Sequence, residues 1–252
     1  MPTKNGDFIL ANYTCKVKES GEVVETTIES VAKEAGLHHE HGHEDEKKEH
    51  VYEPMFLIPG ERWVPKGLDE GLVGLEVDKT TTLEISPEKA YGTRDPSKLK
   101  LLPLRRFKKE GFEPAPGMQV EIDRKPAMIR SVGAGRVQVD FNHPLAGKTL
   151  VYDLKVEKIL ESKQDKARAI IHRKIPDVPA EKFVLTLSEQ MVIEVPEEAY
   201  FLEGIQLAKR SIASDFHKFM PEFEKVSYVE SFKKPPAPAE PKPKQAEARA
   251  DK

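Results

Sequence analysis

Five histidines crowd a short charged segment and could bind a divalent metal ion. They are His38, His39, His41, His43 and His50, separated mainly by acidic residues. Neutral imidazoles suit Zn²⁺, Ni²⁺ or Cu²⁺, and a flexible loop could bring several of them to one ion. The segment from Leu37 to His50 has almost no apolar residues, so the simpler interpretation is a solvated loop with incidental histidines. We nevertheless predict that it binds a divalent metal, nickel or zinc, in vitro.

Covalent catalysis finds little support in the residue pattern. The chain has one cysteine, Cys15, which excludes an intramolecular disulfide and a cysteine-rich zinc site. No serine–histidine–aspartate or cysteine–histidine set has a usable spacing. Three tyrosines, Tyr13, Tyr91 and Tyr152, lie in or beside β-like segments far apart in the sequence. Taken alone, a tyrosine on the apolar face of a strand is usually a core residue.

Composition excludes several classes of protein. Lys and Arg total 40 against 43 Asp and Glu, a net charge of -3, so a general nucleic-acid partner is not expected. No segment approaches the roughly 20 apolar residues of a membrane span. Residues 1–7 are polar and show no signal peptide. We therefore expect a soluble, cytoplasmic protein with no membrane partner.

The first part of the chain has the pattern of a β-rich domain. Alternating apolar residues predict a strand pair over residues 7–28 and a strong strand over residues 149–159. A further strand is expected over residues 80–85. Between them, one helical turn is expected over residues 31–36, and Leu68, Leu72 and Leu75 predict a short helix facing a core.

Two later regions differ from this pattern. Prolines punctuate residues 93–140, where strands over 119–122 and 136–141 and a basic helix face at 105–109 indicate an insertion with a small core. Beyond it we expect a helix at 161–174, a strand or hairpin at 183–195, a long helix from Pro196 to about Met220, and a strand at 223–232. Residues 233–252 are rich in Pro, Ala, Lys and Glu and should be disordered.

Two motifs give the chain a family resemblance. The run GERWVPKGLDEGLVGLEVDKTTTLEISPEKAYG, Gly60–Gly92, resembles the central segment of FKBP-type peptidyl-prolyl cis-trans isomerases. The run NHPLAGKTL, Asn142–Leu150, is similar to the segment that closes the flap in the SlyD-like subgroup with an insert-in-flap domain. The inserted flap together with a C-terminal domain resembles the long type found in archaea.

The resemblance implies a fold and a domain organisation. It implies an α+β protein: an FKBP-like antiparallel half-barrel around a short helix, an inserted β-rich flap domain and a small C-terminal α/β domain. The catalytic domain would comprise residues 1–92 and 141–160, and the insert-in-flap chaperone domain residues 93–140. Residues 161–232 would form the C-terminal domain, before the tail.

The resemblance also implies a proline pocket between the sheet and the short helix. Its catalytic residues would be Tyr13, Glu25, Tyr91 and Tyr152. Its substrate-binding residues would be Val24, Met55, Val64, Pro65, Leu68 and Leu145. Three residues depart from the family pattern: Glu25 replaces an aspartate, Leu68 an aromatic floor, and Pro65 a residue whose N–H binds ligand. We therefore expect weak binding of macrolide inhibitors.

The implied function is prolyl isomerisation with chaperone activity toward unfolded proline-containing polypeptides, and no cofactor is required. Apolar residues of the insert could bind such clients or fill its own core: Leu99, Leu101, Leu102, Leu104, Phe107, Phe112, Met118 and Met128. Two alternatives are a holdase with weak or no isomerase activity and a metal-binding protein. Residues 161–232 could form a homodimer or a packed monomeric domain. The family's nickel-binding tail has no counterpart here, so we expect the histidine segment to be dispensable for isomerisation.

Overall fold

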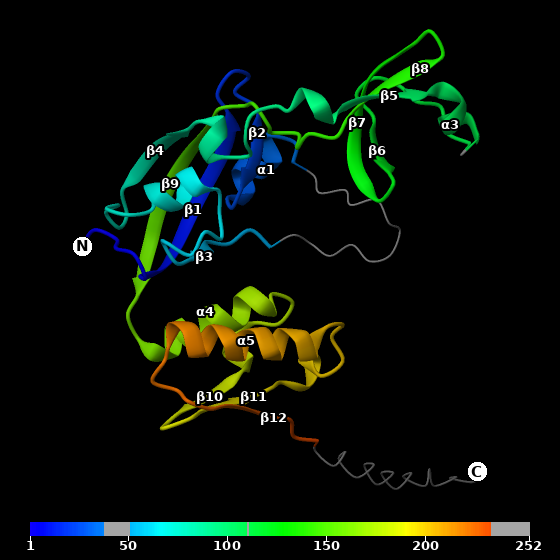
Figure 1. Ribbon diagram of the computed structural model, residues 1–252. Helices are drawn as coiled ribbons and strands as arrows, with labels where there is room; N and C mark the ends of the chain where they lie inside the picture. The colour runs from blue at the N-terminus through cyan, green and yellow to red at the C-terminus, as the bar shows by residue number, and fades with distance from the viewer. Residues whose placement is uncertain (38–50, 110, 233–252) are drawn as a thin grey trace, which may run out of the picture. The chain divides into compact units, whose positions relative to one another are not determined.

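The computed structural model describes residues 1–37, 51–109 and 111–232 (Figure 1). The chain divides into one compact unit of residues 1–166 and a second that begins at Ala167, and each is considered by itself. Both units combine helices with β-sheets, so the predicted α+β class is confirmed. In the described ranges no helix is long and apolar enough to cross a membrane.

Two long antiparallel strands form the centre of the first unit. They are β1 (Phe8–Val17) and β9 (Leu150–Leu160), paired along their whole length with one register shift after Leu10. Alternate residues of β1 are almost fully buried: Ile9, Ala11, Tyr13, Cys15 and Val17. This is the predicted face, because side chains alternate across a strand.

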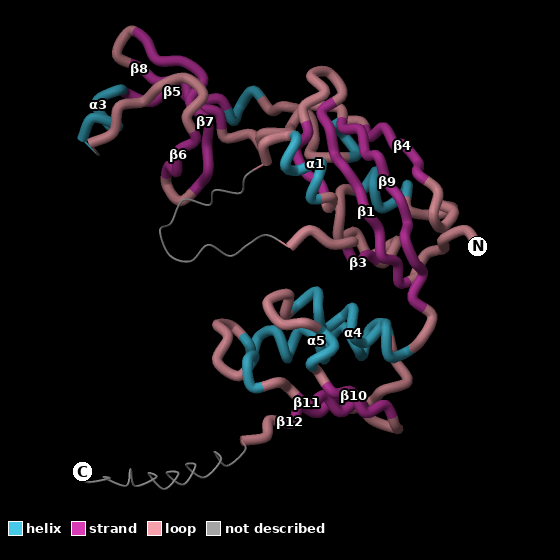
Figure 2. Tube along the Cα trace, turned by 180° about the vertical axis from the view of Figure 1, so that it is seen from behind, coloured by secondary structure: helices cyan, strands magenta, loops and turns pink. Residues whose placement is uncertain are grey.

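Three shorter strands complete this sheet, and all pair antiparallel. Its order is β2-β1-β9-β4, and β3 also pairs with β1. The strands are β2 (Val23–Thr26), β3 (Met55–Leu57) and β4 (Thr80–Ile85). Two helices of six residues accompany the sheet, α1 (Glu29–Glu34) and α2 (Lys66–Gly71). Figure 2 shows the same sheet from behind.

The insertion has a separate sheet of four antiparallel strands in the order β5-β8-β7-β6. The strands are β5 (Leu99–Pro103), β6 (Gln119–Ile122), β7 (Lys125–Gly133) and β8 (Arg136–Asp140), and α3 (Leu104–Lys109) follows β5. Its core residues are Phe107, Ile122, Ala127, Ile129, Val137 and Val139. The insertion therefore buries apolar side chains of its own, as predicted.

Strand β7 was not predicted, and its first residues explain why. Pro126 lies near the start of β7 and pairs with β6, while pairing with β8 begins only at Met128. The turn before β7 consists of Asp123 and Arg124, whose φ angles are 52° and 60°. Such a two-residue hairpin turn is usually marked by Asn-Gly or Asp-Gly. Here the turn has no glycine, and the proline argues against a strand when only the sequence is considered.

The second unit contains a three-stranded sheet and a long helix. It begins within α4 (Lys163–Lys174) and continues into β10 (Val184–Leu187), β11 (Met191–Glu194), α5 (Ile205–Phe219) and β12 (Val226–Val229). β10 pairs antiparallel with β11, and β12 pairs parallel with β11. The parallel pair is possible because α5 carries the chain back to the start of the sheet.

The prediction of a helix from Pro196 is wrong. Pro196 is extended, with φ −72° and ψ 149°, and only a short 3-10 turn, Glu197–Ala199, follows it. Gly204 then has φ 75°, a left-handed conformation that a right-handed helix cannot contain. Helix α5 therefore begins at Ile205, nine residues after the proline (205 − 196).

Candidate active site

Tyrosines from distant parts of the chain meet in the core of the first unit. Tyr13 and Tyr152 are 3% and 1% exposed, and their ring centroids lie 5.8 Å apart. The register explains this distance: Tyr13 pairs with Leu154, so Tyr152 on the same face is its diagonal neighbour. Tyr91, which follows β4, packs against the same cluster and is partly buried. The three phenols are therefore brought together.

The three hydroxyl groups have different partners. The Tyr13 hydroxyl donates to Glu25 Oε1 at 2.6 Å and lies 3.9 Å from Met55 Sδ. The Tyr152 hydroxyl forms a hydrogen bond with Cys15, its partner across the strand pair. Among the described residues, Tyr91 has no hydrogen-bond partner for its hydroxyl. Its donor is therefore available to a ligand.

Burial makes these groups harder to ionise. Burial raises the pKa of Tyr13, and the Glu25 carboxylate raises it further. The pKa of Tyr152 is raised by burial and by its hydrogen bond to Cys15. Burial also raises the pKa of the Cys15 thiol to about 11, although the bond from Tyr152 opposes this. At neutral pH the core therefore contains neither thiolate nor phenolate, and Cys15 is no nucleophile.

These pKa shifts predict that alkaline conditions destabilise the protein. In an unfolded chain the thiol ionises near pH 9.0 and the phenols near pH 10.0. Because folding raises these pKa values, the folded state keeps protons that the unfolded chain releases. The free energy of unfolding should stay constant up to about pH 9 and fall as the pH rises toward 11. Urea unfolding across this pH range measures the effect.

The Tyr152→Phe variant is the control for that measurement. Phenylalanine has no ionisable group, so the variant should lose less unfolding free energy between pH 9 and 11 than the parent protein. An unchanged slope would contradict the assigned shift of the Tyr152 phenol.

The predicted substrate-binding residues lie around this cluster. Leu68, in α2, is 1% exposed and belongs to its buried core. Four others pack against the core and are partly buried: Val24, Met55, Val64 and Leu145. Pro65 precedes α2 with φ −50° and ψ 142°, and as a proline it has no N–H. Glu25 is exposed and joins the group through Tyr13.

A buried carboxylate that sequence reasoning missed supports the loop before α2. Asp69 is 7% exposed and accepts hydrogen bonds from the backbone N–H groups of Gly60, at 3.2 Å, and Arg62, at 3.3 Å. Arg62 has φ 56°, an uncommon conformation for a residue with a side chain. Asp69 therefore holds the turn that leads to Val64. The sequence of α2, KGLDEG, has a second acidic residue beside it, Glu70, so no local pattern distinguished Asp69.

Two glycines of α2, also missed, let this helix approach β4 closely. A Cβ atom at Gly67 would lie 2.4 Å from Ile85 Cγ2, and one at Gly71 would lie 2.5 Å from Leu83 Cδ1. Side chains at these positions would push α2 away from the sheet. The four-residue spacing, which places both glycines on one side of a helix, was the available signal.

His143, which the motif contained without an assigned role, covers the ring of Tyr91. The two rings are stacked, with centroids 4.1 Å apart and an interplanar angle of 3°. His143 Nδ1 accepts a hydrogen bond from the Leu145 N–H at 3.2 Å. Burial lowers the pKa of His143, which favours the neutral ring that this acceptor requires. His143 thus fixes the Tyr91 ring from one side.

The predicted metal-binding histidines, His38, His39, His41, His43 and His50, lie outside the described residues. Elsewhere, in the ranges that the structure covers, no group of three or more His, Cys, Asp or Glu side chains could hold a metal ion. The metal site stays a prediction. The predicted disordered tail, residues 233–252, also lies outside the described residues.

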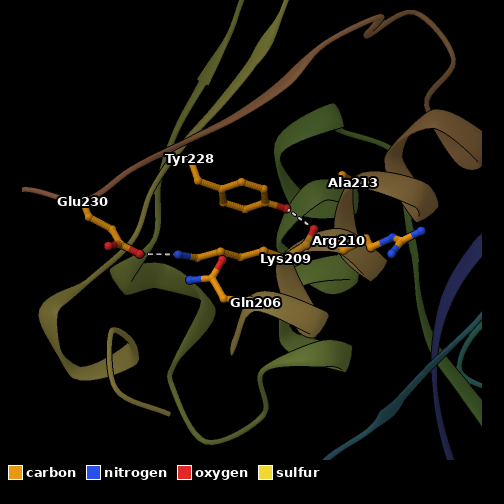
Figure 3. Close-up of a pocket in the computed structure, with 6 residues that line it drawn as sticks. All are labelled: Gln206, Lys209, Arg210, Ala213, Tyr228 and Glu230. Atoms are coloured by element: carbon orange, nitrogen blue, oxygen red, sulfur yellow. Dashed lines mark hydrogen bonds and ion pairs between the residues drawn. The ribbon is translucent and has the colours of Figure 1, made fainter. Parts of the chain in front are cut away.

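A shallow depression of about 500 Å³ lies in the second unit, between α5 and β12 (Figure 3). It is lined by Gln206, Lys209, Arg210, Ala213, Tyr228 and Glu230. The Lys209 ammonium is paired with Glu230, and the Tyr228 hydroxyl donates to the Lys209 carbonyl at 2.7 Å. These charges satisfy one another, and the depression has none of the predicted site residues.

Comparison with known proteins supports the resemblance. The family described as "FKBP26, IF domain" matches residues 100–145, and "FKBP26_C-terminal" matches residues 163–233. A short-type peptidyl-prolyl cis-trans isomerase of Methanocaldococcus jannaschii is 36% identical over 156 residues, which cover 62% of this chain and 93% of that protein.

Two bacterial proteins are also similar to part of this chain. The FKBP-type 16 kDa peptidyl-prolyl cis-trans isomerase of Escherichia coli K12 is 32% identical over 42% of this chain and 74% of that protein. The FKBP-type isomerase SlyD of Helicobacter pylori is 32% identical over 48% of this chain and 66% of that protein.

Proposed function

The chain belongs to the FKBP-type peptidyl-prolyl cis-trans isomerases, SlyD-like with an insert-in-flap domain, and on this basis we propose that it isomerises X-Pro bonds in the tyrosine-walled cluster without a covalent intermediate. The observation that carries the proposal is the convergence of Tyr13, Tyr91 and Tyr152 on one apolar core with Leu68. The sheet forms a half-barrel around α2, and the prolyl ring enters between them, above Leu68.

The energetics of the reaction suit such a pocket. The barrier of about 18–20 kcal/mol comes from amide resonance, which the twisted transition state has lost. The carbonyl of the twisted amide is less charge-separated than that of the planar amide. An apolar environment therefore disfavours the planar form more than the transition state. Binding that is tighter in the transition state accelerates the reaction, and no acid, base or metal is needed.

Each tyrosine has its own role in this proposal. The Tyr91 hydroxyl, which is unpaired among the described side chains, donates a hydrogen bond to the substrate carbonyl. Tyr13 and Tyr152 form the aromatic walls, and Glu25 orients the Tyr13 hydroxyl at 2.6 Å. Val24, Met55, Val64 and Leu145 complete the apolar lining, because they pack against the same core. Pro65 provides an apolar ring where an N–H donor is absent.

Tyr91→Phe tests the proposal in a protease-free refolding assay limited by proline isomerisation. Losing one hydrogen bond costs about 0.5–1.5 kcal/mol, so the variant should accelerate refolding about 2- to 12-fold less than the parent chain. Tyr228→Phe is the matched control, because it loses a half-buried phenolic hydroxyl that donates at 2.7 Å to the Lys209 carbonyl in the second unit. It should leave the rate unchanged. If Tyr91→Phe accelerated refolding as much as the parent chain, this hydroxyl would have no role in catalysis.

Chaperone activity is the second part of the proposal, with unfolded proline-containing polypeptides as clients. Among the strands of the described ranges, the outer strand β5 pairs with β8 alone, so its other edge could accept an extended chain. Three of the predicted client-binding residues are exposed: Leu99 at 36%, Leu101 at 59% and Met118 at 37%. Phe107, by contrast, is 3% exposed and fills the core of the insert. The exposed side chains support client binding.

The same refolding assay separates the alternatives. Suppression of aggregation without acceleration of refolding would indicate a holdase with weak or no isomerase activity. A change in client binding on chelation would indicate metal handling through the histidine segment.

Homodimerisation through residues 161–232 is a further proposal, which light scattering on the full chain tests.

A further inference from the structure

Two linkers join the insert to the five-stranded sheet, residues 90–98 outward and residues 141–149 on the return. Backbone hydrogen bonds tie them together at both ends: Phe141 N–H to the Lys98 carbonyl at 3.1 Å, and Gly147 N–H to the Gly92 carbonyl at 2.8 Å. Between these two bonds, side chains make the connection. The conformation of these side chains therefore determines how the linkers lie against each other.

The Asn142 side chain replaces a backbone pairing between the linkers. Its Oδ1 accepts from the Asp95 N–H at 2.9 Å, and its Nδ2 donates to the Asp95 carbonyl at 3.0 Å. A side-chain amide presents the same donor and acceptor as a peptide group, so it continues the ladder of hydrogen bonds. Asn142 is 9% exposed, so water has little access to these bonds.

Asp140 connects this amide to the insert. Its Oδ1 accepts from the Asn142 backbone N–H at 2.9 Å and from Asn142 Nδ2 at 2.7 Å. Its Oδ2 accepts from Arg130 Nε, in β7, at 3.1 Å and also pairs with Arg94 in the outward linker. The side chain of Asp140 is 2% exposed. One buried carboxylate therefore ties the insert sheet to both linkers, with both of its oxygens bonded.

The segment after this network leads directly to the candidate active site. His143 stacks on Tyr91, and Leu145 packs against the pocket core. His143 and Leu145 have contacts of their own with Tyr91, with each other and with the core, so the loss of the Asn142 bonds should affect the insert rather than the lining of the pocket. The network therefore lies between the insert and the pocket, which are the two sites where the proposed function requires contact with a client.

We propose that Asp140 and Asn142 are positioning residues. Their hydrogen bonds, called the clamp below, hold the two linkers together where the insert begins. A polypeptide bound to the insert then presents its prolyl bond to the Tyr91 side of the pocket. This inference rests on the proposed function, because it assumes that the insert captures clients. Once the insert has bound a polypeptide, the binding of its prolyl bond in the pocket is intramolecular. The gain in effective concentration depends on how the linkers place the insert relative to the pocket. A short peptide that does not reach the insert gains nothing from the clamp.

The test compares two substrates in the full chain. Asn142→Ala and Asp140→Asn are assayed with a short X-Pro peptide and with an unfolded protein whose refolding is limited by proline isomerisation. The variants should lose on the order of tenfold in kcat/KM for the protein and less than about twofold for the peptide. Asp123→Asn is the matched control, because its side chain is 73% exposed and pairs with Arg106 within the insert. It should change neither value.

The outcomes separate the clamp from the proposed function. If the parent chain shows no preference for the protein over the peptide, client capture by the insert fails, whatever the variants do. If the parent has that preference and both variants keep it, the clamp is overturned. An equal loss for both substrates together with a lower melting temperature would also overturn it, because the two residues would then be only structural. Asn142→Ala keeps the Arg94–Asp140–Arg130 pairs, so it provides the test if Asp140→Asn does not fold.

Discussion

Replacing Leu68 by alanine is expected to reduce prolyl turnover about 10- to 200-fold and the free energy of unfolding by about 2–5 kcal/mol. Leu68 is 1% exposed in α2 and belongs to the core that contains Tyr13 and Tyr152. Truncation leaves a cavity that the neighbours fill only in part, which lowers stability. In the proposed pocket it also removes apolar contact below the prolyl ring, which should lower kcat/KM.

Leu72→Ala separates these two effects. Leu72 is 0% exposed, lies at the end of the same helix and belongs to the same core, but it is not among the proposed pocket residues. It should lose a similar amount of stability in urea unfolding and keep its turnover at a temperature where both variants are folded. If Leu72→Ala lost as much kcat/KM as Leu68→Ala, the effect of Leu68 would be one of stability, and Leu68 would not be the floor of the pocket.

Gly67→Ala should have the second largest effect. The added Cβ would lie 2.4 Å from Ile85 Cγ2 and 3.1 Å from Lys89 Cβ, so α2 must shift away from β4. Overpacking of this kind costs about 1–3 kcal/mol, which outweighs the roughly 0.5–1 kcal/mol that alanine contributes to helix stability. Because α2 carries Leu68, kcat/KM should fall as well, by roughly 10- to 100-fold for a displacement near 1 Å. Urea unfolding and the peptide assay measure both losses.

Two further glycine-to-alanine variants provide a comparison for the destabilisation at Gly67. Gly71→Ala meets Leu83 Cδ1 at 2.5 Å, but this atom is the end of a flexible side chain that can rotate, so the loss should be smaller. Gly133→Ala, in β7, meets no atom within 4 Å and should change stability by less than about 1 kcal/mol. The expected order of destabilisation is Gly67, Gly71, Gly133. Any other order would contradict the close approach of α2 to β4.

The mechanism that these variants test depends on an uncharged pocket. Burial raises the pKa values of Tyr13 and Tyr152 and that of Cys15, so none of them ionises at neutral pH. Glu25, at the edge of the group, supplies the carboxylate that accepts from Tyr13. The proposed apolar pocket, in which the Tyr91 hydroxyl has no partner among the described residues, is suited to a reaction that loses charge separation in its transition state.

Local patterns in the sequence were sufficient for most strands and for the inward-facing residues. Alternation over residues 7–17 and 149–159 identified β1, β9 and their buried faces, because the two-residue period of a strand is a local property. The strand over residues 80–85 matches β4 in both bounds. Family motifs then indicated which tyrosines belong together, which alternation cannot do.

Other features required the folded chain, because they depend on contacts between distant residues. The diagonal contact of Tyr13 with Tyr152 follows from a strand register that includes a shift after Leu10. The hydrogen bonds from Gly60 and Arg62 to Asp69, and the pair that joins Asp140 to Arg94, 46 residues away, link segments whose separation no periodic pattern encodes. Periodicity reports which face of an element is buried. The partner that buries it is chosen by long-range packing and hydrogen bonding.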